Sequence, residues 1–340
     1  MTTLQDTAAA LVARGKGILA ADESIATMSS RLAATGVEPT EESRRAYREL
    51  LVATEGLATA VSGVILCDET LRQNFADGSP FGTTTRALGI IPGIKVDTGA
   101  KPLPRFDGET VTEGLDGLAG RLAEYSELGA AFAKWRAVIN IGSGRPTAYA
   151  IEANAHALAR YAALCQAAEI VPIVEPEVLM DGSHGIGTCE EVTEAVLRAV
   201  FAALSSAGVD LEGVVLKPNM VVAGKSSGIR VSPEEVAGRT VGTLLRTVPD
   251  AVAGVAFLSG GQAPEVATAN LAAMREVQTP WPLTFSFGRA LVDPALKAWA
   301  GRPEHVVSGQ AALRSRVLCN AAALSGEYSE DTERRFAVVG

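Results

Sequence analysis

Residues 213–220 read Gly213-Val214-Val215-Leu216-Lys217-Pro218-Asn219-Met220 and place a lysine directly after a short apolar run. An apolar run without polar alternation is typical of a parallel strand that is buried on both faces. Pro218 cannot continue the ladder, so we expect the ammonium group of Lys217 at the carboxyl end of this strand. A lysine in that place is costly unless it is paired or neutral. A neutral amine is also the nucleophile that a Schiff-base enzyme needs.

Seven other short apolar runs end at a turn or a polar residue, and longer segments of helical periodicity lie between them. The expected strands are 17–22, 63–68, 90–96, 131–136, 170–175, 213–217, 254–259 and 282–286. The clearest expected helices are 147–169, 190–207, 233–246, 263–278 and 304–324, with extra helices in 1–16 and 39–61.

This alternation predicts an α/β fold, a single (β/α)8 or TIM barrel domain over residues 1–340. An open, doubly wound sheet is the alternative. The barrel is favoured because polar residues end nearly every strand, whereas an open sheet gathers its chemistry at one switch point.

Composition narrows the class of protein. The 340 residues are 47% hydrophobic but only 5% aromatic, which indicates an aliphatic core. A net charge of −9 argues against a nucleic-acid partner, because no excess of cations is present to neutralise phosphates. The four cysteines are widely spaced, as expected for free thiols in the cytoplasm. We find neither a signal peptide nor an apolar run of about 20 residues, so no membrane partner is expected.

In a barrel the carboxyl ends of all strands meet at one mouth, and chemically capable side chains gather there. Lys134 and Arg136 are two residues apart and therefore share a face, as Glu175 and Glu177 do unless Pro176 breaks the register. The residues expected at this mouth are Asp22, Lys95, Lys134, Arg136, Glu175, Glu177, Lys217, Ser259, Ser286 and Arg289. Any one of them alone is more often an exposed loop charge, but the set as a whole indicates an active site.

Two glycine-containing stretches are candidate phosphate sites. They are Leu258-Ser259-Gly260-Gly261-Gln262 and Ser286-Phe287-Gly288-Arg289. Glycine lets backbone N–H groups approach an anion, and barrels often bind phosphate with the loops after strands 7 and 8. The histidines His156, His184 and His305 have no ligand-spaced partners, so we expect no metal.

Together these motifs resemble those of the class I fructose-1,6-bisphosphate aldolases. The matching segments run in order from about residue 15 to residue 326. They include Gly17-Ile18-Leu19-Ala20-Ala21-Asp22-Glu23-Ser24, Gly93-Ile94-Lys95-Val96-Asp97, Phe132-Ala133-Lys134-Trp135-Arg136 and Val174-Glu175-Pro176-Glu177. Leu216-Lys217-Pro218-Asn219-Met220, Phe257-Leu258-Ser259-Gly260-Gly261-Gln262 and Gly288-Arg289-Ala290-Leu291 complete the set.

The resemblance implies a homotetrameric enzyme that needs no metal or cofactor. It would cleave fructose 1,6-bisphosphate reversibly to dihydroxyacetone phosphate and glyceraldehyde 3-phosphate. Lys217 would form the Schiff base, Glu175 would carry protons, Asp22 would take the C4 hydroxyl proton, and Lys134 would hold both carboxylates. Glu177 joins this catalytic group. The substrate-binding residues implied are Ser24, Arg31, Lys95 and Arg136 at one phosphate, and Ser259, Gly260, Ser286, Gly288 and Arg289 at the other.

Two departures from the family pattern stand out. The chain ends Arg335-Phe336-Ala337-Val338-Val339-Gly340, without the terminal tyrosine of the animal members, and we expect residues 326–340 to be a mobile tail. Ser30 precedes Arg31 where a basic residue is expected. Two alternative functions stay open: a Schiff-base aldolase that prefers another sugar phosphate, such as sedoheptulose 1,7-bisphosphate, and a barrel that serves only as an interaction scaffold.

Overall fold

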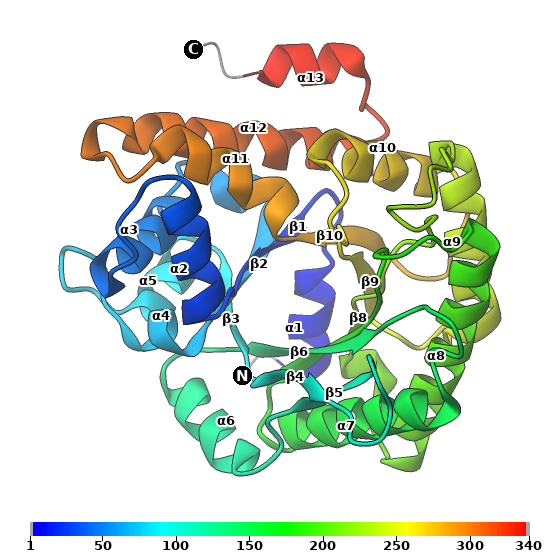
Figure 1. Ribbon diagram of the computed structural model, residues 1–340. Coiled ribbons are helices and arrows are strands. Elements are labelled where there is room, and N and C mark those ends of the chain that lie inside the picture. The colour runs from blue at the N-terminus through cyan, green and yellow to red at the C-terminus, as the bar shows by residue number, and fades with distance from the viewer. Residues whose placement is uncertain (1–2, 338–340) are drawn as a thin grey trace.

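Eight parallel strands close into a barrel in the computed structural model, which describes residues 3–337 (Figure 1). The strands are β1 (Gly17–Ala21), β2 (Val61–Leu66), β3 (Ile91–Lys95), β6 (Phe132–Ile139), β7 (Val171–Val178), β8 (Val215–Leu216), β9 (Gly254–Phe257) and β10 (Leu283–Phe287). Their order around the barrel is β1-β10-β9-β8-β7-β6-β3-β2, and β1 pairs with both β10 and β2. The closed ladder confirms the TIM barrel and excludes the open sheet.

Helices surround the barrel. They are α2 (Ile25–Ala34), α3 (Glu41–Val52), α4 (Asp68–Arg72), α5 (Phe81–Ala87), α6 (Leu118–Glu127), α7 (Ala148–Ala167), α8 (Ile186–Ser206), α9 (Pro233–Thr247), α10 (Pro264–Met274), α11 (Arg289–Trp299) and α12 (Val306–Ser325). Short 3₁₀ turns occur at Leu57–Thr59, Leu211–Gly213 and Pro303–His305. Local sequence sets their starts: the Thr147 hydroxyl accepts the Ala150 N–H, and Ser232 caps α9 just before Pro233. No helix within residues 3–337 is long and apolar enough to cross a membrane.

One end of the barrel is filled by apolar side chains. Helix α1 (Leu4–Leu11) lies across this end and packs Leu11 against the barrel interior (Figure 1). Phe132 fills space that glycine leaves open, because a Cβ on Gly93 would lie 2.3 Å from the Phe132 ring. The apolar filling therefore leaves only the carboxyl ends of the strands available for a site.

Every second residue of a barrel strand points into the barrel, and these inward residues change from apolar to charged toward the carboxyl end of the strand. Phe132 belongs to the interior cluster, and Lys134 and Arg136 follow it at steps of two. Ile173 is followed in the same way by Glu175 and Glu177, and Val215 by Lys217. The same pattern on adjacent strands thus stacks charged side chains above apolar ones.

Strands β6 and β7 are longer than predicted, since their polar residues lie within the strands and not beyond them. Paired residues run in unbroken register from Phe132 and Val171 to Ile139 and Val178, straight through Pro176. The proline, which has no N–H, is tolerated because β8 ends at Leu216, and the paired part of β8 does not reach the level of Pro176. Glu175 and Glu177 consequently keep their common face.

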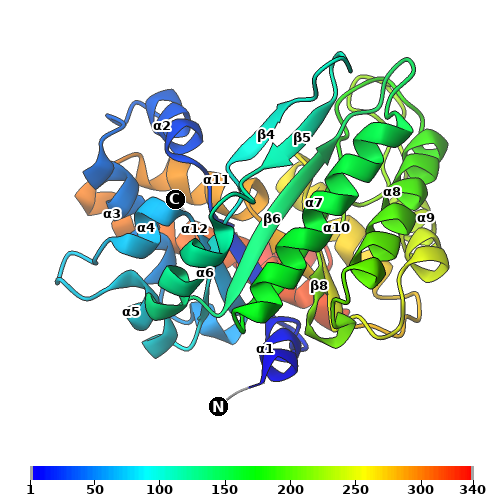
Figure 2. The same cartoon turned by 90° about the horizontal axis from the view of Figure 1, so that it is seen from below.

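A hairpin of β4 (Gly99–Pro102) and β5 (Thr110–Glu113) follows β3 and was not predicted. It lies beside β6 in Figure 2, and the Thr112 hydroxyl donates to the Arg136 carbonyl oxygen at 2.7 Å. Its first strand brings Gly99 and Ala100 to the mouth. Helix α8 also begins four residues earlier than predicted, at Ile186.

Residues Glu330–Phe336 form a helix, α13, within the segment predicted to be a mobile tail (Figure 1). Glu333 on this helix forms an ion pair of 2.5 Å with the buried Arg316 of α12, and accepts a hydrogen bond of 2.8 Å from the Tyr328 hydroxyl. Residues 338–340 lie outside the described part of the chain. The mobility of the tail, like the single-domain assignment, stays a prediction.

Candidate active site

A cavity of 520 Å³ opens at the carboxyl ends of the barrel strands. It is lined by every residue that the sequence predicted for the site, contributed by elements from β1 to α11. These residues are Asp22, Ser24, Arg31, Lys95, Lys134, Arg136, Glu175, Glu177, Lys217, Ser259, Gly260, Ser286, Gly288 and Arg289. The structure thus brings these residues together in one cavity, and the chemical role of each one stays a prediction.

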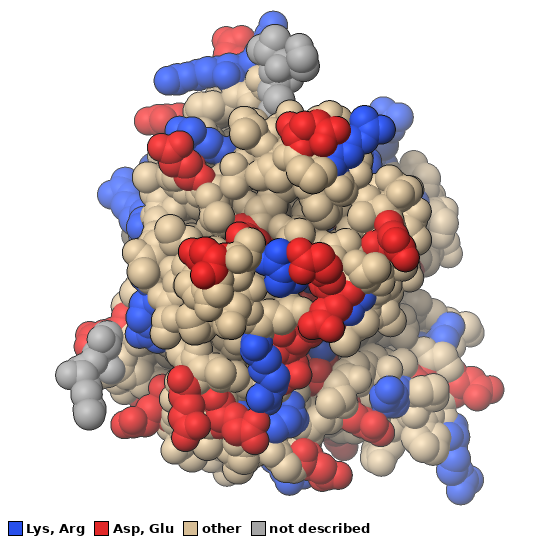
Figure 3. Space-filling model, turned by 90° about the vertical axis from the view of Figure 1, so that its left-hand side faces the viewer, with Lys and Arg blue, Asp and Glu red and all other residues tan. Residues whose placement is uncertain are grey.

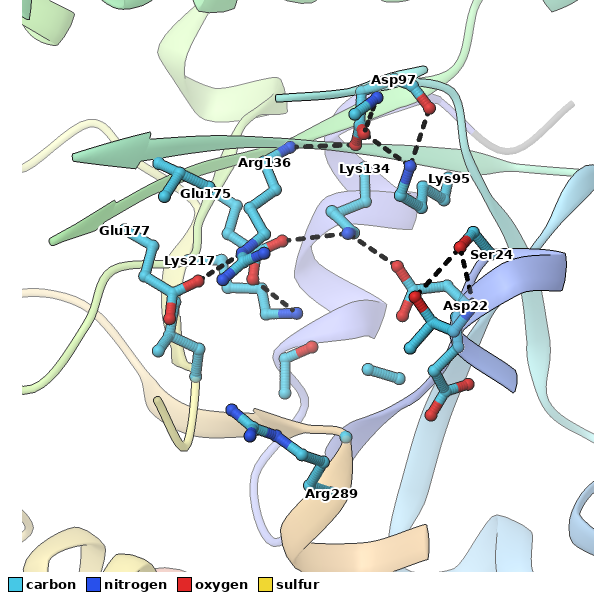
Figure 4. Close-up of a pocket in the computed structure, with 18 of the residues that line it drawn as sticks. Asp22, Ser24, Lys95, Asp97, Lys134, Arg136, Glu175, Glu177, Lys217 and Arg289 are labelled. Carbon is cyan, nitrogen blue, oxygen red and sulfur yellow. Dashed lines mark hydrogen bonds and ion pairs between the residues drawn. The ribbon is translucent and has the colours of Figure 1, made fainter. Parts of the chain in front are cut away.

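Lys217 lies at the bottom of this cavity, one residue beyond the last paired residue of β8. Its backbone N–H donates to the Val174 carbonyl oxygen at 2.8 Å, and its side chain is only 4% exposed. The Nζ atom lies 3.2 Å from Oε1 of Glu175 (Figure 4). The amine therefore has a carboxylate within reach to exchange a proton.

Lys134 is the cation that links the two carboxylates. Its Nζ lies 2.6 Å from Oδ2 of Asp22 and 3.2 Å from Oε2 of Glu175 (Figure 4). Burial lowers the pKa of Lys134, but Asp22 and Glu175 outweigh that effect and raise it well above its usual value. Lys134 consequently stays charged.

The two carboxylates respond in the opposite sense. Burial raises the pKa of Asp22, but Lys134 and Lys217 more than compensate and bring it far below its usual value. The pKa of Glu175 is likewise raised by burial and lowered on balance by Lys134, Lys217 and Arg136. Both groups are thus carboxylates at neutral pH, ready to accept protons.

Two further ion pairs line the β3–β6–β7 side of the cavity. Arg136 pairs with Glu177, and Lys95 lies 2.5 Å from Oδ1 of Asp97. Oδ2 of Asp97 also accepts the backbone N–H of Arg136 at 3.2 Å. Asp97 was missed as a site residue, although its spacing of two from Lys95 could have indicated it.

The opposite side of the cavity is rich in groups that bind anions. Gly260 and Gly261 both have positive φ, at 60° and 89°, which glycine adopts without strain. Gly288 is the residue before α11, and Arg289 is the first residue of that helix. The buried Ser286 hydroxyl has no hydrogen-bond partner within the described residues. These groups fit the phosphate site predicted from the loops after strands 7 and 8.

Arg31 lies at the rim of the cavity and is already paired. Its Nη1 lies 2.5 Å from Oε1 of Glu23 and 3.5 Å from Oδ1 of Asp293. The other carboxylate oxygen of Glu23 meets the buried Arg48 at 2.6 Å. Ser24 caps α2 by accepting the Thr27 N–H, while Ser30 does not line the cavity. Glu23, which sequence reasoning also missed, therefore anchors the rim next to Asp22.

The histidines do not enter the cavity lining. His156 lies on an exposed part of α7, and no group of three His, Cys, Asp or Glu side chains within residues 3–337 is arranged to hold a metal ion. On the face beside α2–α5, acidic and basic side chains lie next to one another (Figure 3).

A barrel that places a buried lysine amine against a carboxylate, with anion-binding groups on both sides, defines an enzyme of the Schiff-base type that acts on phosphorylated carbonyl compounds. The family described as "Glycolytic: Fructose-bisphosphate aldolase class-I" matches residues 3–338. The chain belongs to this family.

Named relatives agree with this assignment. The chain is 59% identical to a "Probable fructose-bisphosphate aldolase class 1" of Xanthomonas axonopodis pv. citri over 87% of this chain and 89% of the relative. It is 53% identical to "Fructose-bisphosphate aldolase 6, cytosolic" of Arabidopsis thaliana over 94% of this chain and 89% of the relative. A solved structure of the Plasmodium falciparum fructose-bisphosphate aldolase, in complex with TRAP and an inhibitor, superposes with a TM-score of 0.94 at 48% identity. The superposition covers 96% of this chain and 95% of that chain.

Proposed function

We propose that this protein cleaves fructose 1,6-bisphosphate reversibly to dihydroxyacetone phosphate and glyceraldehyde 3-phosphate through a Schiff base on Lys217. One observation carries the proposal: the Lys217 amine lies 3.2 Å from Glu175, and Lys134 joins Glu175 to Asp22. A nucleophile, a proton carrier and a second base are then fixed by one cation within a buried site.

Schiff-base formation begins with Glu175. Its carboxylate takes a proton from the Lys217 ammonium, and the free amine attacks the C2 ketone of the substrate. Glu175 then gives a proton to the hydroxyl group of the carbinolamine, which leaves as water and yields the iminium ion. The buried position of Glu175 between Lys217 and Lys134 supports this role.

Carbon–carbon cleavage follows at Asp22. The Asp22 carboxylate takes the proton of the C4 hydroxyl group as the C3–C4 bond breaks, and the bonding electrons flow into the iminium ion to form an enamine. Glyceraldehyde 3-phosphate leaves first. Protonation of the enamine at C3 and hydrolysis of the iminium then release dihydroxyacetone phosphate and free Lys217. Before this proton transfer, Lys134 stabilises the carboxylate form of Asp22.

The substrate phosphates would bind on opposite sides of the cavity. Ser259, Gly260, Ser286, Gly288 and Arg289 all line the cavity and would hold the phosphate on the ketone side through backbone N–H groups, hydroxyl groups and a guanidinium. Lys95, Arg136, Arg31 and Ser24 would meet the second phosphate. Glu177 would hold Arg136 ready for it.

Borohydride trapping tests the proposal. Reduction in the presence of dihydroxyacetone phosphate should inactivate the enzyme and leave one adduct, on the peptide that contains Lys217. EDTA should leave activity unchanged. An adduct on another lysine, or loss of activity in EDTA, would contradict a metal-independent Schiff base on Lys217.

We also propose a cytosolic homotetramer. Support comes from the family, from the word "cytosolic" in the name of the Arabidopsis relative and from the free thiols Cys67, Cys165, Cys189 and Cys319. Light scattering of the purified protein at several concentrations would test the oligomeric state, and a monomer would contradict it.

A further inference from the structure

We propose that Asn219 is a positioning residue that replaces the missing part of the β8 ladder and thereby sets the place of the Lys217 amine relative to Glu175. The inference rests on the function proposed above and adds a residue to it. Asn219 is 4% exposed and does not line the cavity, so it acts through its neighbours and not on the substrate.

On the β7 side, strand β8 holds Lys217 by very little main-chain pairing, whereas on the β9 side the Leu258 N–H still donates to the Pro218 carbonyl oxygen at 3.1 Å. Only Val215 and Leu216 belong to this strand, whereas the adjacent β7 continues to Val178. The Lys217 N–H donates to the Val174 carbonyl oxygen, and Pro218 has no N–H to donate next. The nucleophile is therefore on the last residue that the ladder between β7 and β8 fixes.

The hydrogen-bonding edge of β7 continues past this point. In a parallel ladder, successive residues of a strand point their N–H and C=O groups alternately to the two neighbouring strands. The main-chain groups of Val174 point to β8, so those of Pro176 and Val178 point to β8 as well. The N–H groups of Val171 and Leu179 point the other way, and donate to the carbonyl oxygens of Ala131 and Ile139. Pro176 has no N–H, which makes the buried N–H of Val178 the next donor that needs a partner on the β8 side.

Asn219 supplies that partner. Its Oδ1 accepts the Val178 N–H at 3.0 Å. Its Nδ2 donates to the Thr193 hydroxyl of α8 at 3.2 Å and to the Met220 carbonyl oxygen at 3.1 Å. The amide is thus satisfied on both ends, which fixes its orientation. A side chain two residues after Lys217 joins the end of the strand that carries Glu175 and Glu177.

The segments that follow β7 and β8 are also hydrogen-bonded to each other at residues further along the chain from Lys217. Lys225 N–H donates to the Met180 carbonyl oxygen at 2.7 Å, and Gly224 N–H donates to that of His184 at 2.8 Å. These bonds keep the loops together when Asn219 is changed, so its removal should alter the position of Lys217 without opening the site. Displacements of about 1 Å at a reacting group can cost about 100-fold in rate.

Asn219→Leu, which replaces the amide with an apolar side chain of similar size, is the main test. We expect the rate of borohydride-trapped adduct formation with dihydroxyacetone phosphate, and kcat for cleavage, to fall together by about 10–100-fold. The final amount of adduct per subunit should equal that of the unaltered enzyme. Affinity for hexitol 1,6-bisphosphate, which has no carbonyl group, should change less than threefold. Asn219→Ala, which introduces no new bulk, serves if the leucine variant does not fold.

Thr193→Val is the matched control, because it removes one of the two hydrogen bonds of Nδ2, together with the long contact between Thr193 and the Cys189 thiol, and leaves the Oδ1 bond to Val178 in place. It should trap within about twofold of the unaltered rate. A merely structural role for Asn219 predicts less adduct at an unchanged rate, and that result would overturn the inference. So would an equal rate loss in Thr193→Val. Failure of the unaltered enzyme to form any adduct on Lys217 would instead refute the proposed function.

Discussion

Replacing Lys134 with methionine should separate the two halves of the reaction. The substitution keeps an unbranched side chain that is one atom shorter and removes the charge that lies 2.6 Å from Asp22 and 3.2 Å from Glu175. Asp22 loses its main partner, whereas Glu175 keeps Lys217 at 3.2 Å. Asp22 should therefore be affected more than Glu175.

The magnitude follows from the buried charges. Removal of one partner from a buried ion pair costs about 3–5 kcal/mol, part of which Asp22 recovers by taking up a proton. With Lys134 gone, burial is the largest remaining influence on Asp22, and its pKa rises. A protonated Asp22 cannot accept the C4 hydroxyl proton, so kcat for cleavage should fall by about 10²–10⁴-fold at neutral pH.

The raised pKa of Asp22 sets the direction in which the pH dependence of cleavage should move. In the proposed mechanism cleavage needs the carboxylate form of Asp22, so activity is expected to be lost as pH falls through its pKa. A raised pKa moves this acid limb of kcat/KM to higher pH in Lys134→Met, and part of the activity returns as pH rises. Trapping of dihydroxyacetone phosphate by borohydride does not use Asp22 and should fall much less.

The assay is a coupled measurement of cleavage across the pH range, run beside adduct formation at each pH. Lys101→Met is the control, because Lys101 is exposed on the β4–β5 hairpin and does not line the cavity. The reasoning is refuted if cleavage and trapping fall by the same factor, or if the acid limb stays in place.

Three further pairs of substitutions test the site and the fold. Arg289→Met should raise KM by about tenfold or more for both fructose 1-phosphate and fructose 1,6-bisphosphate. Lys95→Met should raise KM for the bisphosphate only. Equal effects on both substrates in Lys95→Met would contradict the assignment of the two phosphates. Gly82→Ala should destabilise the protein in urea by about 1–3 kcal/mol or more, because the new Cβ would lie 1.9 Å from the Leu128 carbonyl oxygen. Gly120→Ala in α6 meets no atom within 4 Å and should stabilise by about 0.5–1 kcal/mol, so the same sign in both variants would refute the packing argument. Arg316→Met should speed proteolysis of residues 326–337 by removing the pair with Glu333, whereas Arg334→Met, with a side chain 72% exposed, should not.

The sequence is enough to predict the barrel because eight short apolar runs alternate with segments of helical periodicity. Lys217, Asp22 and Lys134 were placed correctly in the cavity by one rule, the convergence of parallel strands at their carboxyl ends. The ends of β6 and β7 were wrong for a related reason. A polar residue was taken as the end of a strand, although in a barrel whose interior is charged at one end the polar residues continue the inward alternation.

Partnerships between side chains were harder to predict than positions. Glu23 and Asn219 carry no signal of their own, because each acts on a residue that is distant in sequence or belongs to another element. Asp97 has only its spacing of two from Lys95, and that spacing says nothing of its bond to the Arg136 N–H. The β4–β5 hairpin was missed because it has no apolar run, and its bonds to β6 come from threonine hydroxyls. Periodicity reports which face is buried, and it carries no information on which polar groups meet there.

The distribution of ion pairs suggests how a protein with a net charge of −9 can still bind a bisphosphate. Lys95, Arg136 and Arg31 are all paired, so a phosphate on their side must compete with Asp97, Glu177 and Glu23. Arg289 has no ion pair within residues 3–337, and Gly261 lies beside it, since a Cβ on Gly261 would be 3.0 Å from its Nη2 atom. With the phosphates assigned as proposed, the ketone-side phosphate would meet a cation that needs no exchange of partners, and we expect it to bind first. The second phosphate then adds selectivity more than affinity, because each contact that it gains replaces one that the free enzyme already makes.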